Sequence, residues 1–427
     1  MVGALDLSDF GLGPDDVLNG ISNELGFAEG DLLVACGSLA EGLGNKKSDL
    51  DLCLLTERAP LKPDPSANRA VVIGGRLVSD VLFVHPDAVR ELGGKLGALY
   101  AGKRDLRAAA KLFTYFEHRL MHRLSNCVIL QPSHDAIERC RSVAGLIPSH
   151  LLGRLKLDRA HYEASALQLD LAGLRDEAQW ASMIFASQEI LGWAIDGLLG
   201  AHGFTNPTPK WRIKLLEYLE ESSIGLLPGF AARSPVELVL ELNRAPAIAT
   251  RESAGAYALR IIGFSRAVFF WGEKAVAGAQ TVPNFASPPL AGDDVQDLLP
   301  ALDIDVDFKP ANGGFDLIRK NRPEGRLHLR SEEAALACIF NGTTTAAQAR
   351  RGLRERDGHF LSATIIESLS ALLEGAQLVQ RPSLDVPTIS EAIELAFDSS
   401  APSEGRRNLG SQFSSEIERL NIERKTA

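Results

Sequence analysis

The stretch from Asp31 to Glu57, DLLVACGSLAEGLGNKKSDLDLCLLTE, constrains the fold of this chain more than any other. It begins with the apolar run 32–36, which predicts a short buried strand that ends at Gly37-Ser38. A second apolar run, 52–55, follows directly after Asp49-Leu50-Asp51. Because residues two apart on a strand point to the same face, Asp49 and Asp51 are predicted to lie side by side.

Two carboxylates on one face repel each other, and burying them without a partner would be costly. A divalent cation is the simplest partner, and Mg²⁺ commonly takes one or two carboxylates together with phosphate oxygens. A third acid, Asp80, stands in the apolar run 76–85, which predicts another strand. If the two strands are neighbours, Asp49, Asp51 and Asp80 are expected to hold two Mg²⁺ ions. Such ions would activate an attacking hydroxyl and stabilise a leaving pyrophosphate.

The Gly37-Ser38 pair has a matching physical role. A glycine lets backbone N–H groups approach phosphate oxygens closely, and a serine hydroxyl adds one more donor. We therefore expect Gly37 and Ser38 to bind the phosphates of a nucleotide.

Taken together, Gly37-Ser38, Ser48-Asp49-Leu50-Asp51 and Asp80 resemble the nucleotidyltransferase superfamily that includes DNA polymerase β and the aminoglycoside nucleotidyltransferases. The resemblance covers the first quarter of the chain and implies a small mixed-sheet domain that binds an NTP. Many relatives carry an arginine shortly after the Gly-Ser pair, where this chain has Glu41. Two alternatives stand beside it: the acids belong to an ordinary turn and solvated strand end, or the chain keeps the fold without the activity.

From residue 87 to about 280 the apolar spacing is helical, and Pro and Gly residues separate the segments. Helices are predicted over 89–100, 106–124, 134–146, 152–174, 178–202, 212–221, 236–243 and 254–276. In the resembling enzymes such a helical domain closes one side of the cleft and helps to select the acceptor. On the helix over 152–174, His161 is interpreted as a packing or surface residue rather than an acceptor contact.

The segment HGFTNPTPKWRIKLLEYLE, residues 202–220, contains a Pro-rich loop followed by Lys210-Trp211 and then Lys214. Several small-molecule nucleotidyltransferases look similar here, which implies that Lys210 reaches the triphosphate, with Lys214 as a further candidate. Lysine is a good point-charge binder of phosphate. The alternative is a basic helix start whose tryptophan packs into the core.

Residues 281–299 are rich in Pro, Ala and Asp and are expected to form a linker. Strands are predicted beyond it at 302–308, 315–318 and 326–329, followed by three helices and a returning strand at 378–379. This order resembles the PqqD-like domain found beside enzymes that modify ribosomal peptides, in which a peptide adds as a strand to the sheet edge. A winged-helix DNA-binding domain is the rival, but residues 331–380 carry four arginines against six acids. A purely structural domain is a third interpretation.

The net charge of −10 argues against a protein that wraps nucleic acid. Five widely spaced cysteines without a CxxC pair fit a reducing compartment, and Cys36 and Cys53 are interpreted as small core residues. No long uncharged apolar run suggests a membrane span, so we expect a cytoplasmic protein. Its expected partners are an NTP and a small-molecule or peptide acceptor.

The sequence therefore predicts an α+β chain with a mixed-sheet nucleotidyltransferase domain (1–100), an all-α domain (101–280), a linker (281–299), a winged-helix or PqqD-like domain (300–382) and a tail (383–427). The expected reaction moves an NMP from an NTP to a hydroxyl or amine and releases pyrophosphate, in specialised biosynthesis or modification. The alternatives are an antibiotic-inactivating nucleotidyltransferase and a regulatory nucleic-acid-binding protein.

Overall fold

The computed structural model describes residues 5, 7–102, 105–131, 134–221, 234–276, 299–320, 322–342, 346 and 363–380. The fold is α+β with a mixed sheet, and the chain divides into two compact units. Unit 1 comprises residues 1–159 and 199–215, and unit 2 comprises residues 160–198 and 216–427. The helices over 101–280, which the sequence places in one domain, are divided between the two units. The boundaries of that helical domain stay a prediction.

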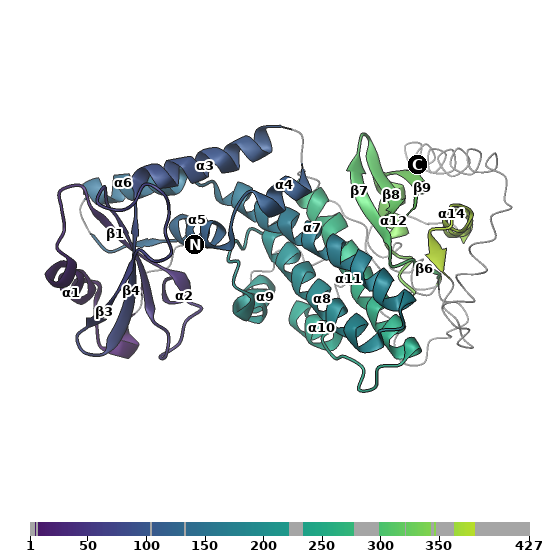
Figure 1. The fold of residues 1–427 in the computed structure, drawn as a ribbon, viewed down its shortest axis with the longest axis horizontal. Coiled ribbons are helices and arrows are strands. Elements are labelled where there is room, and N and C mark those ends of the chain that lie inside the picture. Colours follow the sequence, from purple (N-terminus) through teal and green to yellow (C-terminus); the bar gives the residue numbers. More distant parts are fainter. Residues whose placement is uncertain are drawn as a thin grey trace, which may run out of the picture. The chain divides into compact units, whose positions relative to one another are not determined.

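Unit 1 is built on a five-stranded sheet (Figure 1). Its strands are β1 (Leu32–Cys36), β2 (Leu50–Leu55), β3 (Asn68–Ile73), β4 (Leu77–Val84) and β5 (Val128–Ile129), in the order β3-β4-β2-β1-β5. The pair β2–β4 is parallel and the other pairs are antiparallel. The predicted strands at 32–36, 52–55 and 76–85 are confirmed, and so is the expectation that the two acid-bearing strands are neighbours.

Two strands of this sheet were not predicted. The Pro-rich, polar stretch 58–70 is typical of a loop, but β3 already begins at Asn68 and pairs with β4. The first three residues of β3 are exposed and only Val71 and Ile73 are buried, so its alternating pattern is too short to recognise. The two-residue strand β5 carries even less pattern.

The helices of unit 1 are α1 (Pro14–Leu25), α2 (Gly37–Ala40), α3 (Pro86–Ala101), α4 (Leu106–Lys111), α5 (Tyr115–Ser125), α6 (His134–Gly145) and the first part of α7 (Ser149–Asp176). The prediction of one helix over 106–124 is wrong, because a new helix starts after Thr114. The Thr114 hydroxyl accepts the Glu117 N–H at 3.1 Å, and the Glu117 carboxylate accepts the Thr114 N–H at 2.8 Å. This reciprocal cap fixes the start of α5.

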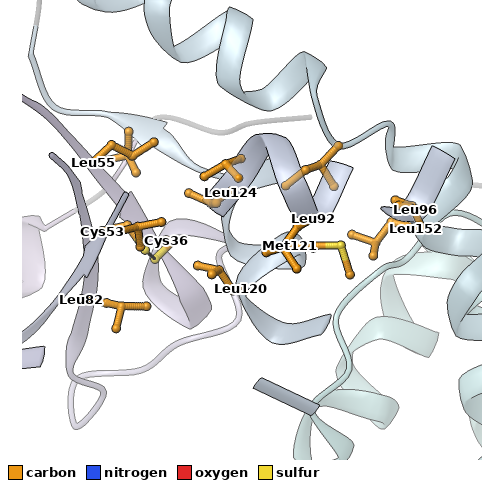
Figure 2. Packing of buried hydrophobic residues seen from close by; sticks show 14 of the residues in the cluster. Cys36, Cys53, Leu55, Leu82, Leu92, Leu96, Leu120, Met121, Leu124 and Leu152 are labelled. Carbon is orange, nitrogen blue, oxygen red and sulfur yellow. Dashed lines mark hydrogen bonds between the residues drawn. The ribbon is translucent and has the colours of Figure 1, made fainter. Parts of the chain in front are cut away.

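The two faces of the sheet bury separate hydrophobic clusters. On one face Leu33, Leu52 and Val81 pack with Val17 and Ile21 of α1. On the other, strand residues such as Cys53 and Leu82 pack with side chains of α3, α5 and α6 (Figure 2). Side chains alternate along β2, so Asp51 points to the same face as Cys53, toward the side that α5 covers.

Unit 2 contains most of α7 and of α8 (Trp180–Ala201), the later part of α9 (Arg212–Glu221), and all of α10 (Pro235–Leu242) and α11 (Arg251–Val276). A three-stranded antiparallel sheet of β7 (Val306–Ala311), β8 (Gly314–Arg319) and β9 (Arg322–Arg330) follows, and then α12 (Ser331–Ala337). Helix α14 (Ala363–Gly375) leads into β10 (Val379–Gln380), which pairs with β6 (Ala301–Leu302).

The strands predicted at 315–318 and 326–329 are confirmed as parts of β8 and β9. The single strand predicted over 302–308 is wrong, because a turn at 303–305 separates β6 from β7. The predicted linker (except residue 299), the middle helix of the C-terminal domain and the tail from residue 383 lie outside the described residues. Among the described residues, no helix has the length and apolar character needed to cross a bilayer.

A cluster of buried charges lies where β7 and β8 meet α7 and α11; we call it the buried charge cluster. Its members are Asp303, Asp305, Asp307, Arg319, Lys320, His161, Arg175, Arg266 and Glu273. Arg266 of α11 donates to the carbonyls of Leu302 at 3.0 Å and Val306 at 2.9 Å. These contacts tie the C-terminal sheet to the helices of unit 2.

Within this cluster His161 is expected to make stability depend on pH. Its ring lies 3.5 Å from Asp307 and 3.7 Å from Glu273 and stacks on Phe269. Burial lowers the pKa of His161, but the carboxylates of Asp307 and Glu273 outweigh it and raise the pKa from 6.5 to about 9. The stabilisation is therefore complete below pH 6.5 and is lost as the pH rises through about 9.

Chemical denaturation at a series of pH values would measure this effect. The free energy of unfolding should fall by at most about 3 kcal/mol between pH 6.5 and 9.5 in the native chain. The slope should flatten in His161→Gln and persist in His150→Gln, a change at an exposed position near the start of α7. Equal slopes in native protein and His161→Gln would contradict a charged His161.

Candidate active site

The three acids singled out in the sequence come from neighbouring parts of the sheet in unit 1. Asp51 of β2 stands directly opposite Asp80 of β4 in the parallel register, and Asp49 immediately precedes β2. Neighbouring strands lie about 4.8 Å apart, so the Asp51 and Asp80 carboxylates start from adjacent positions on one face. Asp49 is exposed, whereas Asp51 and Asp80 are partly buried.

Gly37 lies against the Asp51 carboxylate and lets the backbone approach it closely. Cys36 at the end of β1 pairs with Asp51, and the chain turns at Gly37 into α2 with a φ of +74°. A Cβ atom on Gly37 would lie 2.2 Å from Oδ2 of Asp51, so only glycine allows the backbone to come this close to the carboxylate. Ser38 is buried, and its carbonyl accepts the N–H groups of Leu43 and Gly44, both at 2.8 Å. The loop 37–44 is thereby closed on itself beside Asp51.

Replacing Gly37 with alanine is expected to disturb both stability and site geometry. The positive φ and the clash with Asp51 together should cost about 1–3 kcal/mol and displace the carboxylate. Gly94→Ala on α3, where an added methyl group meets nothing within 4 Å, is the matched control. Thermal denaturation should show Gly37→Ala melting lower than the native chain and Gly94→Ala at or above it. An unchanged melting temperature in Gly37→Ala would contradict the close packing.

Helix α5 brings two arginines to the same acids. Arg123 forms an ion pair with Asp51 in which both side chains are largely buried, 12% and 13% exposed respectively. Arg119 lies one turn earlier on α5 and is exposed. Neither arginine is among the site residues predicted from the sequence, although the repeated His-Arg pairs at 118–119 and 122–123 mark a polar stripe on this otherwise apolar helix.

The ionisation of Asp51 depends on its burial and on the charged groups around it. Burial raises the pKa of the Asp51 carboxyl above its ordinary value, and the charges of Asp49 and Asp80 raise it further. Arg123 and Arg119 act in the opposite direction. The three carboxylates and two guanidinium groups therefore form one interacting cluster in which negative charge is in excess.

Glu41, which stands where many resembling enzymes have an arginine, has a structural role here. Its carboxylate accepts from Nε2 of His122 at 3.0 Å and from the side-chain amide of Asn206 at 3.0 Å. Nδ1 of His122 in turn lies 2.8 Å from the Thr205 hydroxyl. Glu41 therefore links the loop after Gly37-Ser38 to α5 and to the segment around Asn206.

The same segment carries the two lysines that were predicted to bind nucleotide. Lys214 donates to the Leu43 carbonyl at 3.3 Å, which places its charge beside the closed loop 37–44. Lys210 is exposed and lies 4.8 Å from the centre of the Trp211 ring. Lys214 therefore lies at the loop that contains Gly37 and Ser38. Lys210 contacts the ring of Trp211.

The donor set fits a hard divalent cation, because carboxylate oxygens are the ligands that Mg²⁺ prefers. Among the described residues, no three His, Cys, Asp or Glu side chains are already arranged as a metal site. Cys36 and Cys53 are completely buried beneath the acids, as expected for core residues.

Comparison of the chain with models of known protein families and with curated proteins gave no match. Any functional assignment therefore depends on the residues and geometry of the site itself.

Proposed function

We propose that the protein is a Mg²⁺-dependent nucleotidyltransferase of the superfamily that its first quarter resembles. It moves an NMP from an NTP to a hydroxyl or amine of a small molecule or peptide and releases pyrophosphate. The observation that carries this proposal is the pairing of Asp51 with Asp80 on adjacent parallel strands, with Asp49 just before β2 and Gly37 against the Asp51 carboxylate. A solvated strand end, the alternative reading of these acids, does not account for a partly buried carboxylate on each of two neighbouring strands.

In this proposal Asp49, Asp51 and Asp80 hold two Mg²⁺ ions, and Asp80 also accepts the proton of the attacking group. Bound Mg²⁺ would neutralise the charge that develops on the leaving pyrophosphate. The backbone N–H groups at Gly37 and the Ser38 hydroxyl bind the β- and γ-phosphates. Lys214 adds positive charge on the side of the loop 37–44, and Lys210 is the outer candidate for a phosphate contact.

We also propose the three-part architecture expected from the sequence, with a PqqD-like or winged-helix module over 300–382. The antiparallel sheet β7-β8-β9 followed by α12 supports that order of elements. A peptide acceptor is favoured over nucleic acid, because the net charge is −10. A cytoplasmic location is proposed as well, supported by the odd number and the wide sequence spacing of the five cysteines.

The proposal is tested with purified protein, Mg²⁺, each of the four NTPs and panels of aminoglycosides, other small hydroxyl or amine compounds, and peptides. Pyrophosphate release and the mass of the acceptor are measured together. We expect one class of acceptor to gain the mass of an NMP, with pyrophosphate in equal amount and no reaction in EDTA. A protein that binds no NTP by calorimetry, with either Mg²⁺ or Mn²⁺ present, would contradict the proposed function.

A further inference from the structure

Arg123 forms an ion pair with Asp51, a carboxylate on which the proposed reaction depends. Its guanidinium pairs with Oδ1 of Asp51, while Oδ2 of the same group lies against Gly37. Both partners are mostly buried, so water screens this ion pair only weakly. In the structure, the Asp51 oxygen that faces α5 is therefore already used by a cation.

A divalent cation and a guanidinium cannot share that oxygen without strong repulsion, because the effective dielectric constant of a partly buried site is low. Arg123 extends from the rigid helix α5 on a long side chain, so its head group can move without any change in the backbone. The excess of negative charge at Asp49, Asp51 and Asp80 still favours the metal over a single guanidinium. Binding of Mg²⁺ at Asp51 is therefore expected to release Arg123.

A released guanidinium needs a new anion, and a triphosphate held at loop 37–44 would provide one close by. The planar fork of arginine matches phosphate oxygens and can donate two parallel hydrogen bonds. Gly37 contacts the same carboxylate as Arg123, so the phosphate loop and the arginine flank Asp51 from two sides.

We propose that Arg123 has two alternating partners: it is the counter-ion of Asp51 when the site holds no metal, and it contacts the triphosphate when Mg²⁺ and NTP are bound. This inference rests on the proposed function and adds to it a residue that couples metal binding to nucleotide binding. The exchange keeps a positive charge beside Asp51 at all times, first that of arginine and then that of the metal.

Calorimetry on Arg123→Gln tests this inference with two ligands, Mn²⁺ and a nucleotide, whose affinities should change in opposite directions. Affinity for Mn²⁺ alone should rise about tenfold, because the competing cation is gone. Affinity for an α,β-methylene NTP in saturating Mg²⁺ should fall about tenfold, because a charged phosphate contact is lost. Arg123→Lys, which keeps the charge but not the fork, should bind Mn²⁺ like the native chain and bind the nucleotide more weakly. Arg90→Gln, an exposed change on α3, is the control and should alter neither affinity.

The outcomes separate this inference from the proposed function. If native protein binds the nucleotide but Arg123→Gln moves both affinities in the same direction, Arg123 only ties α5 to β2 and the inference fails alone. If native protein binds neither Mn²⁺ nor the nucleotide, the proposed function fails and this inference with it. Melting temperatures of the metal-free variants show whether a loss of binding reflects unfolding.

Discussion

Asp51→Asn is expected to reduce pyrophosphate release by about 1,000-fold or more, which corresponds to roughly 4 kcal/mol of transition-state stabilisation. Asp51 is the acid with the most contacts in the site: it stands opposite Asp80, packs on Gly37 and pairs with Arg123. Asparagine has the same shape but lacks the charge that holds a divalent cation. Asp80→Asn should show a loss of similar size, because Asp80 stands at the same level of the neighbouring strand.

The same substitution should leave the stability of the fold almost unchanged. Burial raises the pKa of Asp51, which means that the folded chain holds the ionised carboxylate less readily than the unfolded chain does. Asparagine removes this cost of burying a charge and still accepts a hydrogen bond from Arg123, but it leaves the guanidinium without its anion, so the two effects oppose each other. A structural acid would behave in the opposite way, since its removal would lower the melting temperature. Loss of activity at full stability therefore identifies Asp51 as a functional residue.

The control is Asp64→Asn, a half-exposed acid in the loop before β3 that accepts hydrogen bonds from Ser66. It should release pyrophosphate at the native rate. Calorimetry with Mn²⁺ should show that Asp51→Asn has lost metal affinity. An Asp51→Asn variant that turns over at the native rate, or that keeps the metal affinity of the native chain, would rule out the metal role.

Much of the candidate site could be predicted because its residues stand close together in the sequence. Gly37 directly follows β1, Asp49 directly precedes β2 and Asp51 lies in β2, so one short connection separates them. Asp80 is a single acid in an apolar run, and such an acid is hard to explain without a function. Arg119 and Arg123 could not be assigned in the same way. They reach the site only because α5 packs against the sheet face that carries Asp51, a long-range contact that the His-Arg pairs at 118–119 and 122–123 do not reveal by themselves. The T-x-x-E pattern at Thr114–Glu117 was a local signal of the start of α5, and it was overlooked.

The alternation over 302–308 shows a second limit of sequence patterns. In a strand this alternation places Ile304, Val306 and Phe308 on one face, and all three are buried. The intervening acids Asp303, Asp305 and Asp307 would normally face solvent, but they are buried as well. Their partners come from α7, α11 and the end of β8, far away in the sequence. His161 was accordingly interpreted as a packing or surface residue, although it belongs to the buried charge cluster.

Asp307→Ala is expected to have the largest effect on stability of any substitution considered, a loss of about 3–5 kcal/mol in the free energy of unfolding. Asp307 accepts from the Ser165 hydroxyl at 2.6 Å and pairs with Lys320 and His161, each at 3.5 Å. Charges of Lys320 and His161 lower the pKa of Asp307 well below its ordinary value despite its burial. Removing the carboxylate would leave two buried cations without this anion, and burying such charges is costly.

Urea denaturation of Asp307→Ala and of Asp176→Ala would measure the difference. Asp176 ends α7 with a side chain that is 65% exposed, so its ion pair with Arg175 should contribute less than about 1 kcal/mol. The loss of unfolding free energy in Asp307→Ala should also be smaller at high pH. There His161 loses its proton, so that of the two cations that paired with Asp307 only Lys320 keeps its charge. If both variants unfold at the same urea concentration, the buried charge cluster does not hold the C-terminal sheet to its helices. If instead only Asp307→Ala is destabilised, and least so at high pH, Asp307 and His161 act as one coupled pair within that cluster.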